Sequence, residues 1–205
     1  MKPIIYVLFL SVGITFAQEN SNYTITINGE KYDYSLGQNF EYNAKKKGKL
    51  NINISQKDIL SYNDGIIKFN HTKNFPISEA PEEDGIKQMT LISSDGSGVI
   101  IQQYRDFDPA LMLDLMLNEV TKESKEYGYT EKVADVEITL KDGKKLKGKK
   151  STLEYQGAVD EWIVYTYSRK DSGIIFLSMD IDKNTESDNS NKNIKTFFES
   201  LEILN

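Results

Sequence analysis

The sequence contains no cysteine and only one histidine, His71. Without cysteine the chain forms no disulfide, and it provides no thiol nucleophile and no cysteine-ligated metal site. A single histidine excludes a zinc site built on two histidines, and we do not expect Ser-His-Asp hydrolysis. His71 stands between Asn70 and Thr72 near a predicted strand end, which favours a surface or hydrogen-bonded role over a catalytic one.

A surplus of basic residues is also absent. The chain has 25 lysines and arginines against 31 acidic residues, a net charge of −6. Binding to nucleic acid needs a basic face, so this charge argues against nucleic acid as a partner. The fold must rest on its hydrophobic core, for which a chain of this size has enough residues.

Only one long apolar run occurs, at the N-terminus. Lys2 precedes the run Ile4–Phe16, and Thr15-Phe16-Ala17 offers small residues at the two positions that a signal peptidase reads. The run is too short for a typical spanning helix of about 20 residues, although an uncleaved anchor is the alternative. We expect residues 1–17 to be a cleaved signal peptide, which predicts an exported protein, periplasmic or secreted, with no transmembrane segment after cleavage. Without cysteine at the cleavage point, no lipid anchor is expected.

Residues 18–56 show short strand patterns and form a predicted N-terminal β-hairpin extension. Tyr23–Ile27 and Glu30–Tyr34 alternate in polarity and flank Asn28-Gly29, a pair that favours a type I′ hairpin turn. Further strands are predicted at Asn39–Tyr42 and at Leu50–Ile54, where Leu50, Ile52 and Ile54 would form one buried face.

Residues 57–205 show strands, a helix, strands and a second helix. Asn63-Asp64-Gly65 is a turn, and strands are predicted at Ile66–Asn70, Ile86–Ser93 and Val99–Tyr104. The long helix begins with Asp108 as N-cap and Pro109 in the first helical position, and it ends at Gly128.

Further strands and a second helix follow Gly128. Strands are predicted at Val133–Leu140, Leu146–Tyr155, Trp162–Ser168 and Ile174–Ile181, followed by a helix at Asn193–Leu204. Leu146 and Leu153 lie an odd number of positions apart, so in a regular strand their side chains would point to opposite faces. If both are to face one core, a bulge is needed between them, and it is predicted at Gly148. The order predicts an α+β fold in which a mainly antiparallel sheet is flanked by a long central helix and a C-terminal helix.

Residues 57–205 resemble PsbP/DcrB-like domains. The likeness lies in Gly65–Phe69 leading to Phe75-Pro76, in the hairpin that ends in Val99–Tyr104, in the long helix and in the terminal Ile194–Leu201. The likeness is one of pattern and element order, because the family has no invariant catalytic motif. It implies an α/β/α-type sandwich around an antiparallel sheet and, since family members act chiefly in this way, a role as a binding or assembly module.

One short segment matches part of a calcium loop. Asp180, Asp182 and Asn184 occupy its first three ligand positions, but Thr185 replaces the glycine of the sharp turn and Asn191 replaces the closing glutamate. A polar strand end explains the pattern better. Calcium would bind weakly if at all, and no other cofactor is predicted.

Lysines cluster on a predicted hairpin. Lys144, Lys145, Lys147 and Lys149 would contact an anionic surface such as lipid headgroups, or would be solvated side chains that prevent strands from pairing edge to edge. The second interpretation is favoured, because the cluster has no interleaved aromatic residues.

The sequence therefore predicts an exported, non-enzymatic binding or assembly module of a bacterial envelope or secretome, with a protein or cell-envelope partner. The alternative is a carboxylate-based secreted glycan hydrolase or a weak calcium-binding protein. A hydrolase needs two carboxyl groups facing one cleft, and no pair is marked in the sequence.

Overall fold

The computed structural model describes residues 21–44, 49–182 and 188–204. The predicted signal peptide, residues 1–17, lies outside the described residues. No helix in these ranges is long and apolar enough to cross a membrane.

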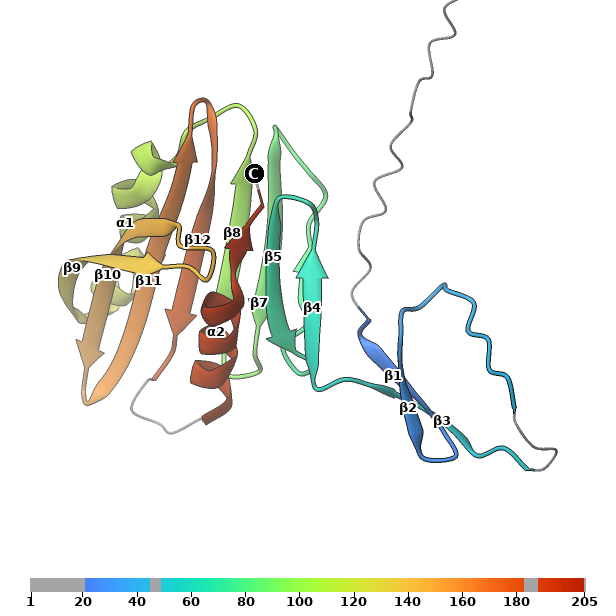
Figure 1. Ribbon diagram of the computed structural model, residues 1–205. Coiled ribbons are helices and arrows are strands. Elements are labelled where there is room, and N and C mark those ends of the chain that lie inside the picture. The colour runs from blue at the N-terminus through green and yellow to red at the C-terminus, as the bar shows by residue number, and fades with distance from the viewer. Residues whose placement is uncertain (1–20, 45–48, 183–187, 205) are drawn as a thin grey trace, which may run out of the picture.

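A seven-stranded antiparallel sheet forms the centre of the molecule (Figure 1). Its strand order is β6-β7-β8-β12-β11-β10-β9. The strands are β6 (Ile77–Glu79), β7 (Ile86–Ile92), β8 (Gly98–Tyr104), β9 (Thr130–Thr139), β10 (Lys145–Tyr155), β11 (Ala158–Arg169) and β12 (Ser172–Asp180). The hairpins β7-β8, β9-β10 and β11-β12 agree with the predicted strand pairs. The first two turns contain Gly96 and Gly143, whereas the third is Lys170-Asp171, with Asp171 at φ 57°.

One face of this sheet is covered by α1 (Leu113–Tyr127), which follows the 3-10 turn Pro109–Met112. Asp108 Oδ1 accepts a hydrogen bond from the Ala110 amide at 3.0 Å, and Gly128 ends the helix at φ 112°. Both predicted helix ends are thus confirmed. Leu117 of α1 packs in a cluster with buried side chains of β11 and β12.

The opposite face is covered by α2 (Asp188–Ser200) and by a small sheet of order β13-β5-β4. Its strands are β4 (Ile59–Asn63), β5 (Ile67–Thr72) and β13 (Glu202–Ile203). Phe197 of α2 and Phe69 of β5 meet with ring centroids 4.6 Å apart, and both side chains are fully buried. The two covering layers confirm the predicted α+β architecture, a mainly antiparallel sheet with one long central and one C-terminal helix.

The C-terminal helix ends earlier than the predicted Leu204. After Ser200 the chain becomes extended, Ile203 pairs with Ile67, and the Leu204 amide donates to Ile66 O at 2.7 Å. Leu201 and Ile203 are both buried in this conformation. Alternation therefore buries the last apolar residues better than a helix would.

The predicted bulge at Gly148 is wrong. The register of β10 is continuous against both neighbours, and Gly148 pairs with Tyr165. The side chains of Leu146 and Leu153 point to opposite faces of the sheet, and both are buried because both faces are covered. Gly148 is needed for another reason: a Cβ there would lie 2.3 Å from Val164 O and 2.7 Å from the Tyr165 ring.

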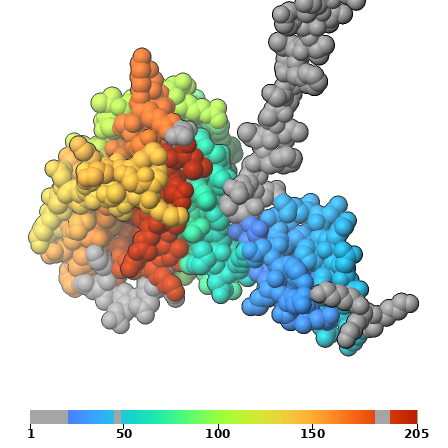
Figure 2. All heavy atoms as spheres, in the orientation of Figure 1, coloured from blue at the N-terminus to red at the C-terminus, as the bar shows by residue number. Residues whose placement is uncertain are grey.

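Residues 23–56 form a separate small sheet of order β2-β1-β3, which stands to one side of the rest of the molecule (Figures 1 and 2). Its strands are β1 (Tyr23–Ile27), β2 (Glu30–Tyr34) and β3 (Ile52–Gln56). The predicted hairpin is present, with Asn28 at φ 50° and Gly29 at φ 92°. The division of the chain into residues 18–56 and 57–205 stays a prediction.

Two expectations for this region are wrong. Asn39–Tyr42 forms no strand; Phe40 instead packs edge-on against Tyr32 and Tyr34. The face of Leu50, Ile52 and Ile54 is exposed, because no helix or second sheet among the described residues covers β3.

Candidate functional site

A pocket of about 380 Å³ opens where β8 ends and β12 begins, beside the turn between β4 and β5. Strands from both the seven-stranded sheet and the small β13-β5-β4 sheet supply its walls. Its lining residues are Asp64, Ile66, Lys87, Gln103, Tyr104, Arg105, Tyr167, Arg169, Ser172, Gly173, Ile174 and Ile203. Polar and charged side chains thus meet three isoleucines in one hollow, a composition suited to binding.

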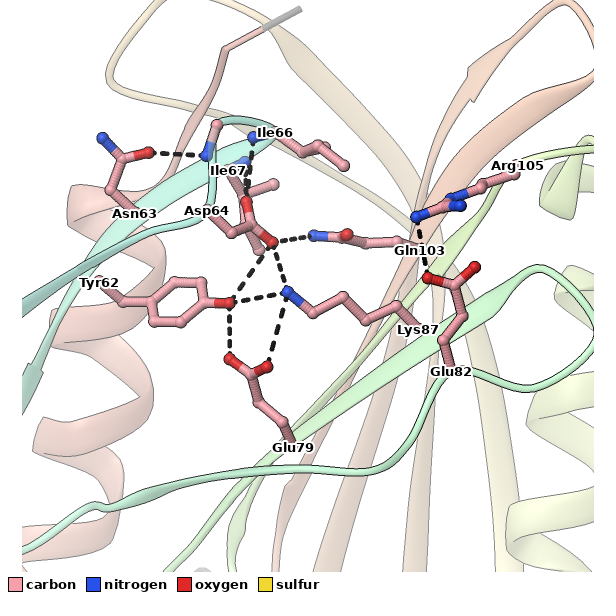
Figure 3. Close-up of polar contacts among 11 residues, drawn as sticks. Tyr62, Asn63, Asp64, Ile66, Ile67, Glu79, Glu82, Lys87, Gln103 and Arg105 are labelled. Atoms are coloured by element: carbon pink, nitrogen blue, oxygen red, sulfur yellow. Dashed lines mark hydrogen bonds and ion pairs between the residues drawn. The ribbon is translucent and has the colours of Figure 1, made fainter. Parts of the chain in front are cut away.

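The turn Asn63-Asp64-Gly65 fixes the position of Asp64. Asp64 Oδ1 accepts hydrogen bonds from the amides of Ile66 and Ile67, both at 2.9 Å. The Asn63 side chain accepts from the Gly65 amide at 2.9 Å. These local bonds hold one carboxylate oxygen against the backbone and direct the other, Oδ2, toward β7 and β8 (Figure 3).

Asp64 Oδ2 is the centre of a polar cluster (Figure 3). It accepts from Gln103 Nε2 at 2.9 Å and from Lys87 Nζ at 3.1 Å. Lys87 Nζ also donates to the Tyr62 hydroxyl at 3.1 Å, and this hydroxyl donates to Glu79 Oε1 at 2.8 Å. The cluster joins β4, β6, β7 and β8, and so ties the small sheet to the central one.

The cluster keeps its charges fixed around neutral pH. Burial opposes ionisation of Asp64, but hydrogen bonds from the Ile67 amide, Gln103, the Ile66 amide and Lys87 outweigh it and keep the pKa of Asp64 below its usual value. Burial raises the pKa of Tyr62 to about 12. Burial also works against the charge of Lys87, yet its bonds to Tyr62 and Asp64 raise the pKa above the ordinary lysine value.

These pKa directions limit the chemistry of the cluster. Lys87 stays an ammonium and is no nucleophile, while Tyr62 stays a phenol. Asp64 stays a carboxylate, whereas a glycosidase general acid needs a raised pKa. The cluster is therefore suited to holding a fixed pattern of charge and hydrogen bonds, not to moving a proton near neutral pH.

Two exposed arginines line the pocket, in different situations. Arg105 forms an ion pair with Glu82 at 2.8 Å (Figure 3). Arg169 lies over the Tyr167 ring, 5.4 Å from its centroid. Within the described parts of the chain, Arg169 has no carboxylate partner. It is therefore available to an anion from outside, with Tyr167 holding the guanidinium by a cation–π contact.

Two of the three predicted calcium residues, Asp180 and Asp182, lie in the described part of the chain, and the calcium site stays a prediction. Asp180 is the last residue of β12, and Asp182 lies in the following turn at φ 47°. The Asp182 amide donates to Asp160 Oδ1 at 2.9 Å. Asn184 lies outside the described residues. In the ranges that the structure covers, no group of three or more acidic or histidine side chains is placed to hold a metal.

The predicted lysine cluster is largely paired with acids. Lys144 binds Asp142 at 2.8 Å and also donates to Ile203 O at 2.8 Å. Lys145 binds Glu137 at 2.6 Å, and Lys149 binds Asp114. Lys147 is exposed on β10. This pairing reduces the net positive charge that the hairpin presents to an anionic surface.

His71 is buried, with Nδ1 2.9 Å from Phe75 O and 3.0 Å from Thr72 O. Burial lowers its pKa, although the two carbonyl contacts act in the opposite direction. The hydrogen-bonded role is the correct one of the two proposed for it, since Nδ1 donates its proton to the loop that follows β5.

Sequence reasoning did not identify the pocket. The sequence indicated Asn63-Asp64-Gly65 only as a turn. An aspartate in a turn can accept hydrogen bonds from the backbone amides that follow it, and this was a local signal for an ordered carboxylate. Lys87, Gln103 and Arg169 carry no local signal, because they come from three strands that only the sheet brings together.

Comparison with known proteins yields structural likeness only. No model of a known family matches the sequence, and no curated protein does. The solution structure of PsbP from the cyanobacterium Synechocystis is similar over 71% of this chain and 92% of that chain, with 8% identity and a TM-score of 0.46. A crystal structure from Bacteroides thetaiotaomicron is similar over 73% of this chain and 49% of that chain, with 11% identity and a TM-score of 0.39. Both TM-scores lie below 0.5 and both identities are low, so neither match assigns a family or a function to this chain.

Proposed function

We propose that this protein is an exported, non-enzymatic binding module whose pocket holds a small carboxylate-bearing molecule. The observation that carries the proposal is Arg169, an exposed cation lining the pocket that rests on Tyr167 and has no carboxylate partner in the described chain. A guanidinium recognises a carboxylate with two parallel hydrogen bonds, so this geometry suits a carboxylate better than a neutral group.

The rest of the pocket supports a mixed polar and apolar ligand. Ile174 and Ile203 are almost fully buried and offer an apolar wall, and Ser172 lies beside them with a hydroxyl. The Asp64 carboxylate is already neutralised by Lys87, so it does not repel an anion as an isolated carboxylate would. A volume of about 380 Å³ admits a compact molecule.

The proposal is tested by titrating the labelled protein with small carboxylates, the matching amides and the matching amines, while backbone amide signals are followed by NMR. Carboxylates are expected to shift the signals of Arg169, Ser172 and Gly173, because these residues line the pocket. Arg169→Gln should weaken binding at least tenfold, the loss of about 1.4 kcal/mol or more that a charge-assisted bond represents. Lys170→Gln is the matched control, since it removes an equal charge one residue away.

Two outcomes contradict the proposal in different ways. Amides or amines that shift the same signals while carboxylates do not would mean that the pocket binds another class of ligand. No shift in the pocket with any compound would mean that it is not a binding site.

Export is a separate part of the proposal. Expression of the full chain in a bacterial host, followed by intact-mass measurement of the protein released from the envelope, is expected to give an N-terminus at Gln18. A cell-associated protein that retains residues 1–17 would contradict it. A protein or cell-envelope partner also stays a prediction.

A further inference from the structure

Most free strand edges in the described sheets are protected against pairing with another chain. β2 carries the charged residues Glu30, Lys31 and Asp33, and β6 has only three residues. The edge strand β4 is occupied by the Asn22 side chain, which accepts from the Ser61 amide at 2.9 Å and donates to Ser61 O at 3.3 Å. Charges, short strands and side-chain cover are the usual means of preventing edge-to-edge association.

β3 has none of these protections. No charged residue occurs from Leu50 to Gln56, and all five residues of the strand are exposed. The side chains of Ile52 and Ile54 are 59% and 60% exposed, and Leu50 is 41% exposed. Exposed apolar side chains on an uncharged edge mark a surface for association.

The backbone of β3 also presents unused hydrogen-bonding groups. Toward β1, the Asn28 amide donates to Asn51 O at 3.0 Å and the Lys57 amide donates to Asn22 O at 2.9 Å. In an antiparallel pair such residues alternate, so the odd-numbered residues of β3 bond to β1. The N–H and C=O groups of Ile52 and Ile54 therefore point away from the sheet, as a template for another strand.

We propose that β3 pairs antiparallel with β3 of a second copy of this chain, which joins two three-stranded sheets into one of six strands. The uncharged strand supports a second copy as the occupant: two chains of net charge −6 meet along β3 without placing like charges together in the strand. A strongly acidic or basic partner would find no opposite charge between Leu50 and Gln56.

The side chains select one register. With Ile52 opposite Ile52 of the second copy, Leu50 lies opposite Ile54, so that the exposed apolar residues of both strands are neighbours on one face. Lys49 then lies opposite Ser55. A shift by one step, with Ile52 opposite Ile54, would set Lys49 opposite Lys57 and is disfavoured by like charge. The contact involves one short strand on each side, so a weak, concentration-dependent dimer is expected.

The first test is sedimentation of the full chain over a wide concentration range. The wild-type protein is expected to change from the mass of one chain to that of two, and Ile52→Lys should raise the midpoint concentration at least tenfold. Ile59→Lys is the matched control, because Ile59 is an exposed isoleucine of β4 outside the proposed contact, and its midpoint should stay that of the wild type.

The second test uses the absence of cysteine. In the proposed register the two Ile52 Cα atoms are about 5.5 Å apart, within the range of a disulfide. Ile52→Cys is therefore expected to give a disulfide-linked dimer under mild oxidation, while Ile59→Cys under the same conditions stays a single chain. A wild-type chain that remains monomeric at the highest concentration overturns the proposal, as do assemblies larger than two chains or equal crosslinking of both variants. Pairing of β3 with an unrelated extended peptide instead of a second copy would overturn it as well.

Discussion

The seven-stranded sheet and the β2-β1-β3 sheet are built from similar alternating strands, but their environments differ. In β12 every residue from Gly173 to Met179 is buried, because α1 covers one face and α2 with β5 covers the other. In the β2-β1-β3 sheet only Ile25 and Ile27 of the strand residues are buried. The apolar residues of an alternating strand are therefore buried in a core only where another layer of structure covers that face of the sheet.

The difference has functional consequences. The pocket at Asp64 is built between two packed sheets, so its side chains are held by neighbouring strands as well as by each other. β3 has few packed contacts and an open edge, which suits it to association instead of to precise positioning.

The largest effect is expected from Phe197→Ala. Phe197 is fully buried and touches Phe69, Phe176 and Phe198, so its loss leaves a cavity and should reduce the free energy of unfolding by about 3–5 kcal/mol. Denaturant unfolding followed by circular dichroism measures this change. Lys195→Ala, at an exposed position of the same helix, should change stability by less than about 0.5 kcal/mol.

Ile27→Ala tests the other region. Ile27 is 2% exposed, and its truncation should weaken the β2-β1-β3 sheet locally by about 2 kcal/mol. Hydrogen exchange should become faster in residues 23–34 and remain unchanged in β8 and β12. Equal loss of protection in both sheets would show that they unfold as one unit and would contradict the contrast drawn above.

A smaller effect is expected from Asp64→Asn, about 1–2 kcal/mol at pH 7, because the charge-assisted bonds to Lys87 and Gln103 are weakened. The folded-state pKa of Asp64 is below its unfolded value, so this contribution is present above about pH 4 and is lost as the pH falls through the folded-state pKa. The stability difference between wild type and variant should therefore shrink in acid. A difference that grows as the pH falls would contradict the proposed role of the carboxylate.

The smallest effect concerns His71. Its folded-state pKa is lowered, so the neutral ring contributes stability above the unfolded pKa of about 6.5, and this is lost as the pH falls through the folded-state value. The melting temperature of the wild type should fall between about pH 7 and pH 5. His71→Gln should flatten this decline, with a change of about 1 kcal/mol or less. If the melting temperature of the variant falls with pH as steeply as that of the wild type, groups other than His71 cause the fall.

The parts of the fold that were predicted correctly depend on local chemistry. Asn28-Gly29 adopts positive φ angles that other residues avoid, Asp108 caps a helix start, and Gly128 ends the helix. Each of these signals acts within a few residues, so a neighbouring layer is not needed to interpret it.

Three of the wrong predictions involve groups that are distant in sequence. The bulge at Gly148 was inferred from one buried face, whereas two layers bury both faces and the Tyr165 ring occupies the space beside Gly148. The buried face expected for β3 is exposed, because no layer in the described part of the chain covers it. The end of α2 depends on β5, which offers Ile67 and Ile66 as pairing partners.

Local sequence was sufficient for the Asn28-Gly29 turn, both ends of the long helix, the strand hairpins and the absence of thiol and two-histidine chemistry, because these depend on the residues themselves and their near neighbours. The tertiary structure alone decided which alternating face is buried, where β3 is left open, and that Asp64, Lys87 and Arg169 share one pocket. Burial and pairing arise from contacts between elements far apart in the chain. Even residues that indicate each element correctly do not specify which layer will cover it.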